Sequence, residues 1–249
     1  MAERTEIESF LNTLLSVDSF KDYGPNGLQV EGRPQVRRLV SGVTASLAFI
    51  DAAIEAGADA LLVHHGLFWR GQDGRLTGWL KARVARLMAA DLSLFAYHLP
   101  LDAHAELGNN AQLGLLLGLV ADRRFGEQQL GFAGPAAGLR DLPTLAAQLQ
   151  SVLGRAPTVV AGDGRTLARI GWCTGGAQGY FEAALAAGVD AFLTGEISEP
   201  QAHLARETGV AFLACGHHAT ERYGAPAVGA FVARQLGLEH QFIDISNPA

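Results

Sequence analysis

The chain has 249 residues, of which 49% are apolar, so it can bury a sizeable core in one large domain or two small ones. Its formal net charge of −6 and the lack of any basic run argue against a nucleic-acid surface. The N-terminus has no apolar core of the kind a signal peptide carries, and no apolar stretch approaches the about 20 residues of a membrane span. Two cysteines are too few for a disulfide scaffold. We therefore expect a folded protein of the cytoplasm.

The first half of the chain alternates expected helices and strands, which is typical of an α/β fold. Apolar residues at helical spacing predict a helix over residues 5–16, and a dense turn at 22–27 precedes a short strand at 28–30. The further expected elements are strands at 38–43, 60–63 and 93–97, a helix at 45–56 that Thr44 caps and Gly57 ends, a helix that ends near Ala90, and a helix that Asn109 and Asn110 begin ahead of the apolar segment 113–119.

The middle of the chain, from residue 121 to 171, contains no cluster that suggests chemistry, and we expect it to be scaffold. Asp141 and Pro143 predict the start of a helix that runs to Leu153. The apolar segments 158–161 and 167–170 flank Gly162-Asp163-Gly164, which predicts a hairpin.

The second half repeats the order of elements in the first. Residues 52–62 align without a gap with residues 183–193, and each segment is a helix, a glycine stop and a strand that begins Asp-Ala. Phe95–His98 followed by Asp102 also resembles Leu213–His217 followed by Glu221. We infer an internal duplication, with a first α/β lobe over 1–122 and a second over 123–249.

Paired histidines at the end of an apolar strand suggest a metal site. Adjacent residues of an extended strand face opposite ways, so His64 and His65 favour two metals, or one metal and one substrate contact. In the second lobe, His217 and Glu221 would lie one turn apart on a helix. With Asp102, these residues make a nitrogen and oxygen donor set that suits Zn²⁺, Mn²⁺ or Fe²⁺. A pair of such ions activates water, which is hydrolytic chemistry.

Other polar residues near these segments have two interpretations each. His98 is either a structural residue or a group that supports the metal ligands or contacts substrate, and His104 is either functional or the cap of a turn. Glu196 is either an outer ligand or general base, or a carboxylate at a helix N-terminus. Phe68 and Trp69 are expected to form a pocket wall or an interface. The loop 173–179 either holds a phosphate on its backbone amides or, as we favour because a P-loop lysine is absent, forms a tight turn.

Five motifs stand in a fixed order along the chain: GLQVEG at 27–32, HHGLFW at 64–69, HLPLDAH at 98–104 with GNN at 108–110, TGE at 194–196 and GHHATE at 216–221. Together they resemble the NGG-interacting-factor-like family, whose members are also labelled GTP cyclohydrolase I type 2 homologues. The resemblance covers nearly the whole chain, from near residue 20 to residue 224, and departs at Gly66, where many members carry proline.

The resemblance implies two intertwined α/β subdomains with mixed sheets and a toroidal homohexamer whose metal sites face an inner cavity. It also implies two divalent metal ions per chain, with Glu221 as the bridging ligand. The implied metal ligands are His64, His65, Asp102, His217 and Glu221.

Three hypotheses about function follow. In the first, the protein is a dinuclear metal-dependent hydrolase of a nucleotide-like or other small ring substrate. The first candidate reaction is opening of the GTP ring by metal-activated water. Glu196 or His98 would be the proton-transfer group. In the second, it is a non-catalytic metal-binding assembly that stores or delivers metal or binds a partner. In the third, it is a structural α/β module whose histidines are incidental, which predicts no bound metal.

Overall fold

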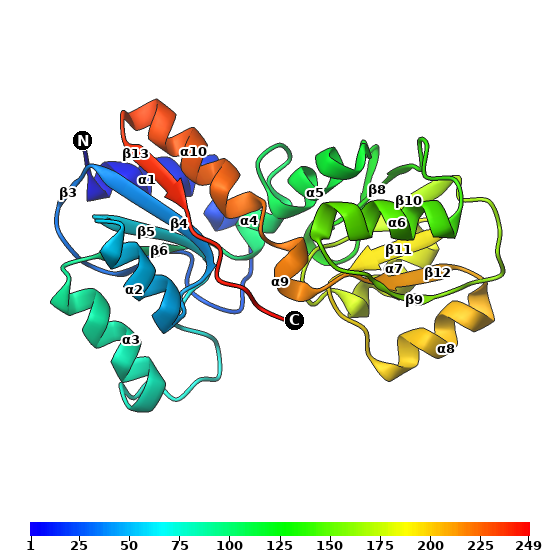
Figure 1. Ribbon diagram of the computed structural model, residues 1–249, viewed down its shortest axis with the longest axis horizontal. Coiled ribbons are helices and arrows are strands. Elements are labelled where there is room, and N and C mark those ends of the chain that lie inside the picture. The colour runs from blue at the N-terminus through cyan, green and yellow to red at the C-terminus, as the bar shows by residue number, and fades with distance from the viewer. The chain divides into compact units, whose positions relative to one another are not determined.

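The computed structural model describes residues 1–249 and divides into two compact units (Figure 1). The first unit consists of Met1–Gly108 and Arg222–Ser246, and the second of Asn109–Glu221 and Asn247–Ala249. The last helix and strand of the chain therefore pack into the first unit. The mixed α/β architecture predicted from the sequence is confirmed.

The first unit is built on a five-stranded mixed sheet in the order β13-β4-β5-β6-β2. Strands β13, β4, β5 and β6 are parallel, and β2 joins the edge antiparallel to β6. The elements of this unit are β1 Ala2–Glu3, α1 Arg4–Leu14, η1 Val17–Ser19, β2 Gly27–Val30, β3 Gln35–Val36, β4 Arg38–Thr44, α2 Leu47–Glu55, β5 Ala60–His65, α3 Gly78–Ala89, β6 Ser93–Ala96, α4 Leu99–Ala103, α10 Gly224–Leu236 and β13 Glu239–Phe242.

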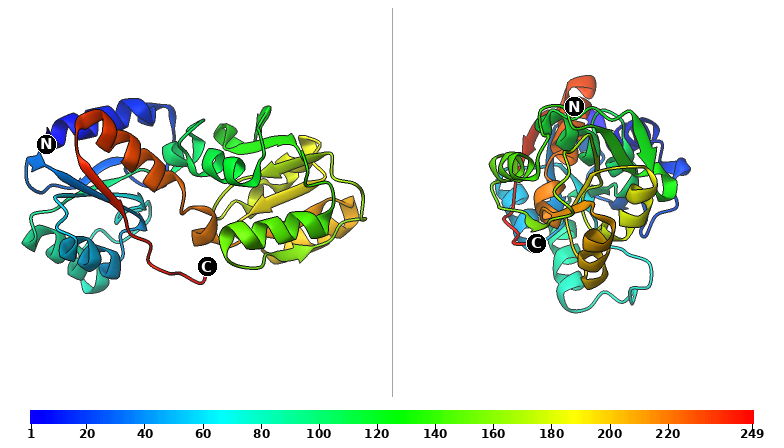
Figure 2. Two further views of the ribbon diagram at one scale, coloured as in Figure 1. Left: turned by 45° about the horizontal axis from the view of Figure 1, so that its top comes forward. Right: turned by 90° about the vertical axis from the view of Figure 1, so that its right-hand side faces the viewer.

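Helices cover both faces of this sheet, which explains why β5 is apolar throughout. Alternate β5 residues point to opposite faces. Leu61 and Val63 pack with α2 and α3, whereas Leu62 packs with α1 and α10. Helices α1 and α10 lie side by side (Figure 2). Since both faces are closed, polar side chains of β5 can be accommodated only at its end, where His64 and His65 stand.

The second unit has a six-stranded sheet in the order β7-β8-β10-β11-β12-β9. Its centre, β10-β11-β12, is parallel, and the flanking strands are antiparallel. Its elements are α5 Asn109–Leu117, β7 Arg123–Phe125, η2 Glu127–Gln129, β8 Gly131–Pro135, α6 Leu142–Leu153, β9 Thr158–Val160, β10 Arg169–Trp172, η3 Gln178–Tyr180, α7 Phe181–Ala186, β11 Ala191–Thr194, α8 Glu199–Thr208, β12 Ala211–Ala214 and α9 His217–Thr220.

Two equivalent aspartates support the inferred duplication. The Asp59 carboxylate, just before β5, accepts hydrogen bonds from the backbone N–H groups of Arg37 and Arg38 at 2.9 Å each. The Asp190 carboxylate, just before β11, accepts bonds from the backbone N–H groups of Ala168 and Arg169 at 2.8 and 2.9 Å. The Asp-Ala pair at the start of each strand therefore fixes the start of the neighbouring parallel strand.

Asp59→Asn is expected to lower the free energy of unfolding by about 1 to 2 kcal/mol at pH 7 and to change its dependence on acid. Burial on its own would raise the pKa of Asp59, but the hydrogen bonds from Arg38 and Arg37 and the charge of Arg33 lower it overall. A lowered pKa in the folded state stabilises the protein above the unfolded-state pKa of about 4, and the stabilisation is lost as the pH falls through the folded-state pKa.

Urea unfolding between pH 3 and 7 measures this effect. The difference between wild type and Asp59→Asn should shrink as the pH falls, and the exposed Asp18→Asn serves as the control. A difference that stays constant over this range would contradict the assignment.

Two local predictions were wrong. The expected hairpin across Gly162-Asp163-Gly164 does not form, because β9 pairs with β12 while β10 pairs with β8 and β11. The helix expected from Ala45 is α2, which begins at Leu47, and its cap is Ser46, whose hydroxyl accepts the Phe49 N–H at 3.2 Å. The helix 142–153 is confirmed, with the Asp141 carboxylate accepting the Thr144 N–H at 2.8 Å.

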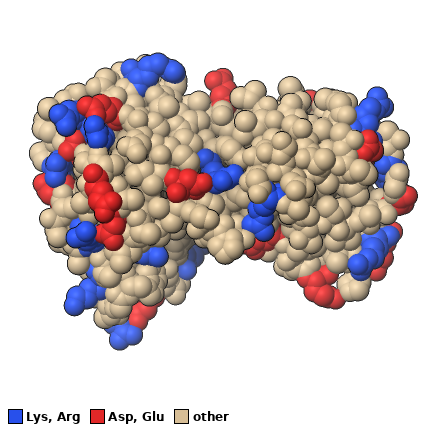
Figure 3. Space-filling view, viewed as in Figure 1, with Lys and Arg blue, Asp and Glu red and all other residues tan.

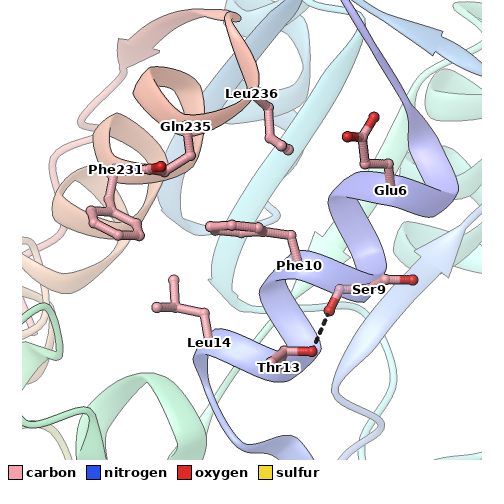
Figure 4. Close-up of a pocket in the computed structure, with 8 residues that line it drawn as sticks. All are labelled: Glu6, Ser9, Phe10, Thr13, Leu14, Phe231, Gln235 and Leu236. Carbon is pink, nitrogen blue, oxygen red and sulfur yellow. Dashed lines mark hydrogen bonds between the residues drawn. The ribbon is translucent and has the colours of Figure 1, made fainter.

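A groove of about 650 Å³ lies between α1 and α10 in the first unit (Figure 4). Phe10 and Phe231 face each other across it, with ring centroids 6.2 Å apart. None of its lining residues is a predicted metal ligand.

On the face drawn in Figure 3, acidic and basic side chains are interspersed within each unit, with no basic patch. No helix has the length and apolar character needed to cross a membrane.

Candidate metal centre

Three imidazoles gather at the carboxyl ends of two neighbouring strands in the first unit. Strand β5 ends in His64 and His65, and parallel β6 leads to His98. Each ring offers one nitrogen, and these three nitrogens lie within 4.8 Å of one another. The carboxyl ends of parallel strands are where α/β sheets place their binding sites. The register of β5 and β6 therefore brings His98 to the paired histidines although they are far apart in the sequence.

Each of these imidazoles is held through its Nδ1 atom. His64 Nδ1 donates to the Tyr97 carbonyl at 3.0 Å, and His98 Nδ1 lies 2.7 Å from the Asp22 carboxylate. His65 Nδ1 lies 3.1 Å from Thr44 Oγ1. Metal-binding histidines typically use one ring nitrogen for such a bond and the other for the ion. In the predicted ligands His64 and His65, the arrangement thus leaves Nε2 as the nitrogen that would bind a metal.

Asp102 adds an oxygen donor to the first unit. It lies on α4, and its Oδ1 is 3.5 Å from His64 Nε2. Both side chains are buried, with 10% of the Asp102 side chain and none of His64 exposed. A buried carboxylate beside imidazoles is a nitrogen and oxygen donor set that suits a divalent transition metal. The predicted ligands of the first unit are therefore brought together.

The predicted ligands of the second unit also lie together. His217 begins the short helix α9 and Glu221 follows its last residue, so that His217 Nε2 lies 3.2 Å from Glu221 Oε2. His217 Nδ1 lies 2.6 Å from Glu196 Oε1. Glu196 precedes α8, which begins at Glu199, so it holds His217 and does not lie in the first turn of a helix.

Two carboxylates around His217 make this place favourable for positive charge. Burial on its own would lower the pKa of His217, but hydrogen bonds and charge from Glu221, and then from Glu196, raise it to about 9. A divalent ion at Nε2 would replace the proton there and satisfy the same negative charge. The donor set of the second unit therefore fits a metal ion as well.

The loop 173–179 forms a tight turn that supports Glu221, which is the interpretation that the sequence favoured. Three of its amide groups donate to side chains: Thr174 to Asn110 at 2.8 Å, Gly175 to Thr220 at 3.0 Å and Ala177 to Thr194 at 3.2 Å. Gly175 has φ +69°, and a Cβ there would overlap the Glu221 carboxylate. Glycine at this position is needed both for the backbone conformation and for space.

Three other candidates have clear positions. The Nδ1 atom of His104 accepts the backbone N–H groups of Glu106 and Leu107 at 3.3 and 3.0 Å, so His104 caps a turn. The Trp69 ring lies edge-on to His98 with centroids 5.0 Å apart. With Phe68 it lines a small cavity beside the histidines, as expected of a pocket wall.

Sequence reasoning missed Asp22, which holds His98. The segment 22–27 carried only a turn signal, and nothing in it pointed to a histidine 76 residues away. Burial on its own would raise the pKa of Asp22, but the hydrogen bonds that its carboxylate accepts from His98, Asn26 and Leu99 lower it overall. Asp22 therefore stays ionised next to His98.

Comparisons with known proteins agree with this picture. The family model described as Duf34/NIF3 (NGG1p interacting factor 3) matches residues 2–248. Among curated relatives, proteins called GTP cyclohydrolase 1 type 2 homolog are 51% identical in Neisseria meningitidis serogroup A, with all of both chains covered, and 45% identical in Escherichia coli K12, with 99% and 100% covered.

Solved structures are similar over the same length. The protein ybgI, described as of unknown function, has a TM-score of 0.94 at 44% identity and covers 99% of this chain and 100% of its own. The protein TTHA1606 from Thermus thermophilus has a TM-score of 0.91 at 33% identity, with the same coverage.

Proposed function

The chain belongs to the Duf34/NIF3 family, and from this premise we propose that it is a dinuclear metal-dependent hydrolase. In this proposal two divalent ions, Zn²⁺, Fe²⁺ or Mn²⁺, are held by ligands from both units. The ligands are His64, His65 and Asp102 of the first unit and His217 and Glu221 of the second, with Glu221 as the bridge.

One observation carries the proposal. Each of the three histidines in this set is bonded through Nδ1 to a protein oxygen, with distances between 2.6 and 3.1 Å. Such bonds orient an imidazole so that Nε2 meets a metal, and histidines that merely fill a core have no need to share the arrangement. Buried carboxylates accompany the imidazoles in both units. Their negative charge favours binding of a cation of charge two or more.

A metal pair of this kind lowers the pKa of a bound water and so supplies a nucleophile near neutral pH. The protein's own residues have complementary tasks. Asp102 and Glu221 supply the negative charge that balances the ions. His98 and Glu196 stand beside the ligands, where each can accept a proton from water and return it to a leaving group.

The substrate class follows from the names of the relatives. Since the curated relatives are called GTP cyclohydrolase 1 type 2 homolog, we propose opening of the imidazole ring of GTP, or of a similar nitrogen ring, by water. We also propose that the protein works in the cytoplasm as a toroidal homohexamer with its metal sites facing the inner cavity. Light scattering on the purified protein would measure the number of subunits.

The test is metal content and GTP hydrolysis in the same samples. Protein purified without chelator or added metal is expected to contain about two ions per chain and to release formate from GTP. His64→Gln should lose metal and at least about 100-fold of the rate. The control is His203→Gln on α8, because the His203 side chain is 60% exposed and lies outside the ligand set.

Different failures remove different parts of the proposal. If the metal-loaded protein releases formate no faster than His64→Gln, the GTP assignment is wrong. If two ions are bound but a panel of nucleotides and cyclic amides is untouched, the protein is the non-catalytic metal-binding assembly. If neither protein contains metal, the centre itself is rejected.

A further inference from the structure

The turn before β2 contains a buried carboxylate with an ordered set of donors. Only 3% of the Asp22 side chain is exposed. Its Oδ1 accepts His98 Nδ1–H at 2.7 Å and the Tyr23 N–H at 2.6 Å. Its Oδ2 accepts the Leu99 N–H at 2.9 Å and Asn26 Nδ2–H at 2.8 Å. A carboxylate with this many defined donors is fixed in both position and rotation.

The same turn also fixes the backbone of His98. The His98 N–H donates to Asn26 Oδ1 at 2.7 Å. Because that bond fixes the oxygen end of the Asn26 amide, its Nδ2 end must face Asp22. Asp22 and Asn26 therefore hold His98 at two points, the ring through Nδ1 and the main chain through N–H.

His98 faces the histidine cluster with its remaining nitrogen. Its ring centroid lies 5.0 Å from that of His64 and 5.7 Å from that of His65. A cavity of about 10 Å³ borders His98, His64 and Trp69. This is about the room that one water molecule needs.

We propose that Asp22 is a positioning residue that keeps a ring proton of His98 on Nδ1, so that Nε2 presents a lone pair beside the His64–His65 cluster and serves as the general base. This inference rests on the proposed hydrolase function. As the water oxygen forms its bond to the ring carbon, the π pair of the C=N bond moves onto its nitrogen, one water O–H bond breaks and that proton passes to His98 Nε2. When the C–N single bond of the ring breaks, the proton on His98 passes to the leaving nitrogen, and the remaining hydroxyl proton passes to the first nitrogen as the carbonyl forms. Asp22 stabilises the imidazolium between the two steps without taking its proton.

The variant Asp22→Asn tests the tautomer with almost no change of shape. If the amide nitrogen took the Oδ2 position, it would face two donors, Leu99 N–H and Asn26 Nδ2–H. In the Oδ1 position it faces one, Tyr23 N–H, and can itself donate to His98 Nδ1. The amide should therefore place its nitrogen towards His98 and move the imidazole proton to Nε2, which removes the basic lone pair.

The first readout is the tautomer itself. Protein with ¹⁵N-labelled histidine and bound Zn²⁺ should give an Nδ1-protonated His98 in wild type and an Nε2-protonated His98 in Asp22→Asn, with His98→Gln used to assign the signals. The second readout is metal content, which should be unchanged in both variants because the proposal places His98 outside the ligand set. The third is rate: kcat should fall by about 100-fold or more while KM changes by less than about twofold.

Asp18→Asn, an exposed carboxylate in the adjacent η1 turn, is the matched control and should match wild type in all three readouts. The inference is overturned if wild-type His98 carries its proton on Nε2, if Asp22→Asn leaves the tautomer unchanged, or if His98→Gln strips a metal ion from the protein. If wild type hydrolyses nothing, the proposed function fails, while the two tautomers still decide whether Asp22 positions His98.

Discussion

Gly175→Ala is expected to weaken metal binding by about 10- to 100-fold and to lower the free energy of unfolding by about 1 to 2 kcal/mol. The φ of +69° disfavours any side chain, and the added Cβ would overlap the carboxylate of Glu221. Only 3% of the Glu221 side chain is exposed, so the carboxylate cannot avoid the added Cβ by moving out into solvent and must be displaced within the protein. The carboxylate should swing away from His217, and the second unit should lose the oxygen donor of its site.

Titration of the metal-free protein with Zn²⁺ or Co²⁺ measures the first effect, and urea unfolding measures the second. Gly179→Ala is the matched control, since it lies in the same segment, has no positive φ and has no atom within 4 Å of the added Cβ. Wild-type affinity in Gly175→Ala would show that Glu221 does not need its observed position to hold metal, and would remove it from the ligand set.

Trp172→Ala is expected to destabilise the second unit by about 4 kcal/mol. Trp172, on β10, is 1% exposed, and its ring centroid lies 5.8 Å from that of Phe132. Its Nε1–H donates to the Asn110 carbonyl at 2.9 Å, while the Asn110 side chain accepts the Thr174 N–H. The substitution leaves a cavity and loosens the support of the loop that contains Gly175.

Urea unfolding followed by circular dichroism measures this loss. Trp79→Ala is the control, because Trp79 is 57% exposed on α3 and its removal should cost about 0.5 kcal/mol or less. Equal losses in the two variants would mean that the packing around Trp172 does not stabilise the second unit.

Patterns within short segments predicted the fold well. The helix at 142–153 followed from a capping aspartate and a proline at its start. The two Asp-Ala pairs marked equivalent strands, β5 and β11, and the equivalence extends to the bonds of Asp59 and Asp190. Capping and periodicity depend on residues a few positions apart, and so they can be recognised from the sequence.

The hairpin failed for the opposite reason. The segments around Gly162-Asp163-Gly164 have the composition of two strands and a turn. This composition is compatible with a hairpin between the two strands and equally with each strand pairing with a more distant one. What decided between them was the position of β10 beside β11, which leaves β9 to pair with β12 at the edge of the sheet. Sheet order depends on contacts between distant segments, which local composition does not encode.

The candidate site divides in the same way. Sequence spacing alone identified two pairs of candidate ligands, the histidines at the end of β5 and His217 with Glu221. This was possible because the members of each pair are close together in the chain. The partners that orient the rings, Asp22 for His98 and Thr44 for His65, are 76 and 21 residues away from them. They could not be foreseen, since a hydrogen bond between distant residues depends on which strands become neighbours.

The amino-acid sequence by itself determined the α/β class, the repeated order of elements and the residue types of the candidate metal site. Only the tertiary structure decided that α10 and β13 belong to the first unit, that Glu196 contacts His217, and that a turn carrying Asp22 contacts His98. The physical reason is that periodicity and capping act along the chain, whereas parallel strand pairing and buried hydrogen bonds act across it.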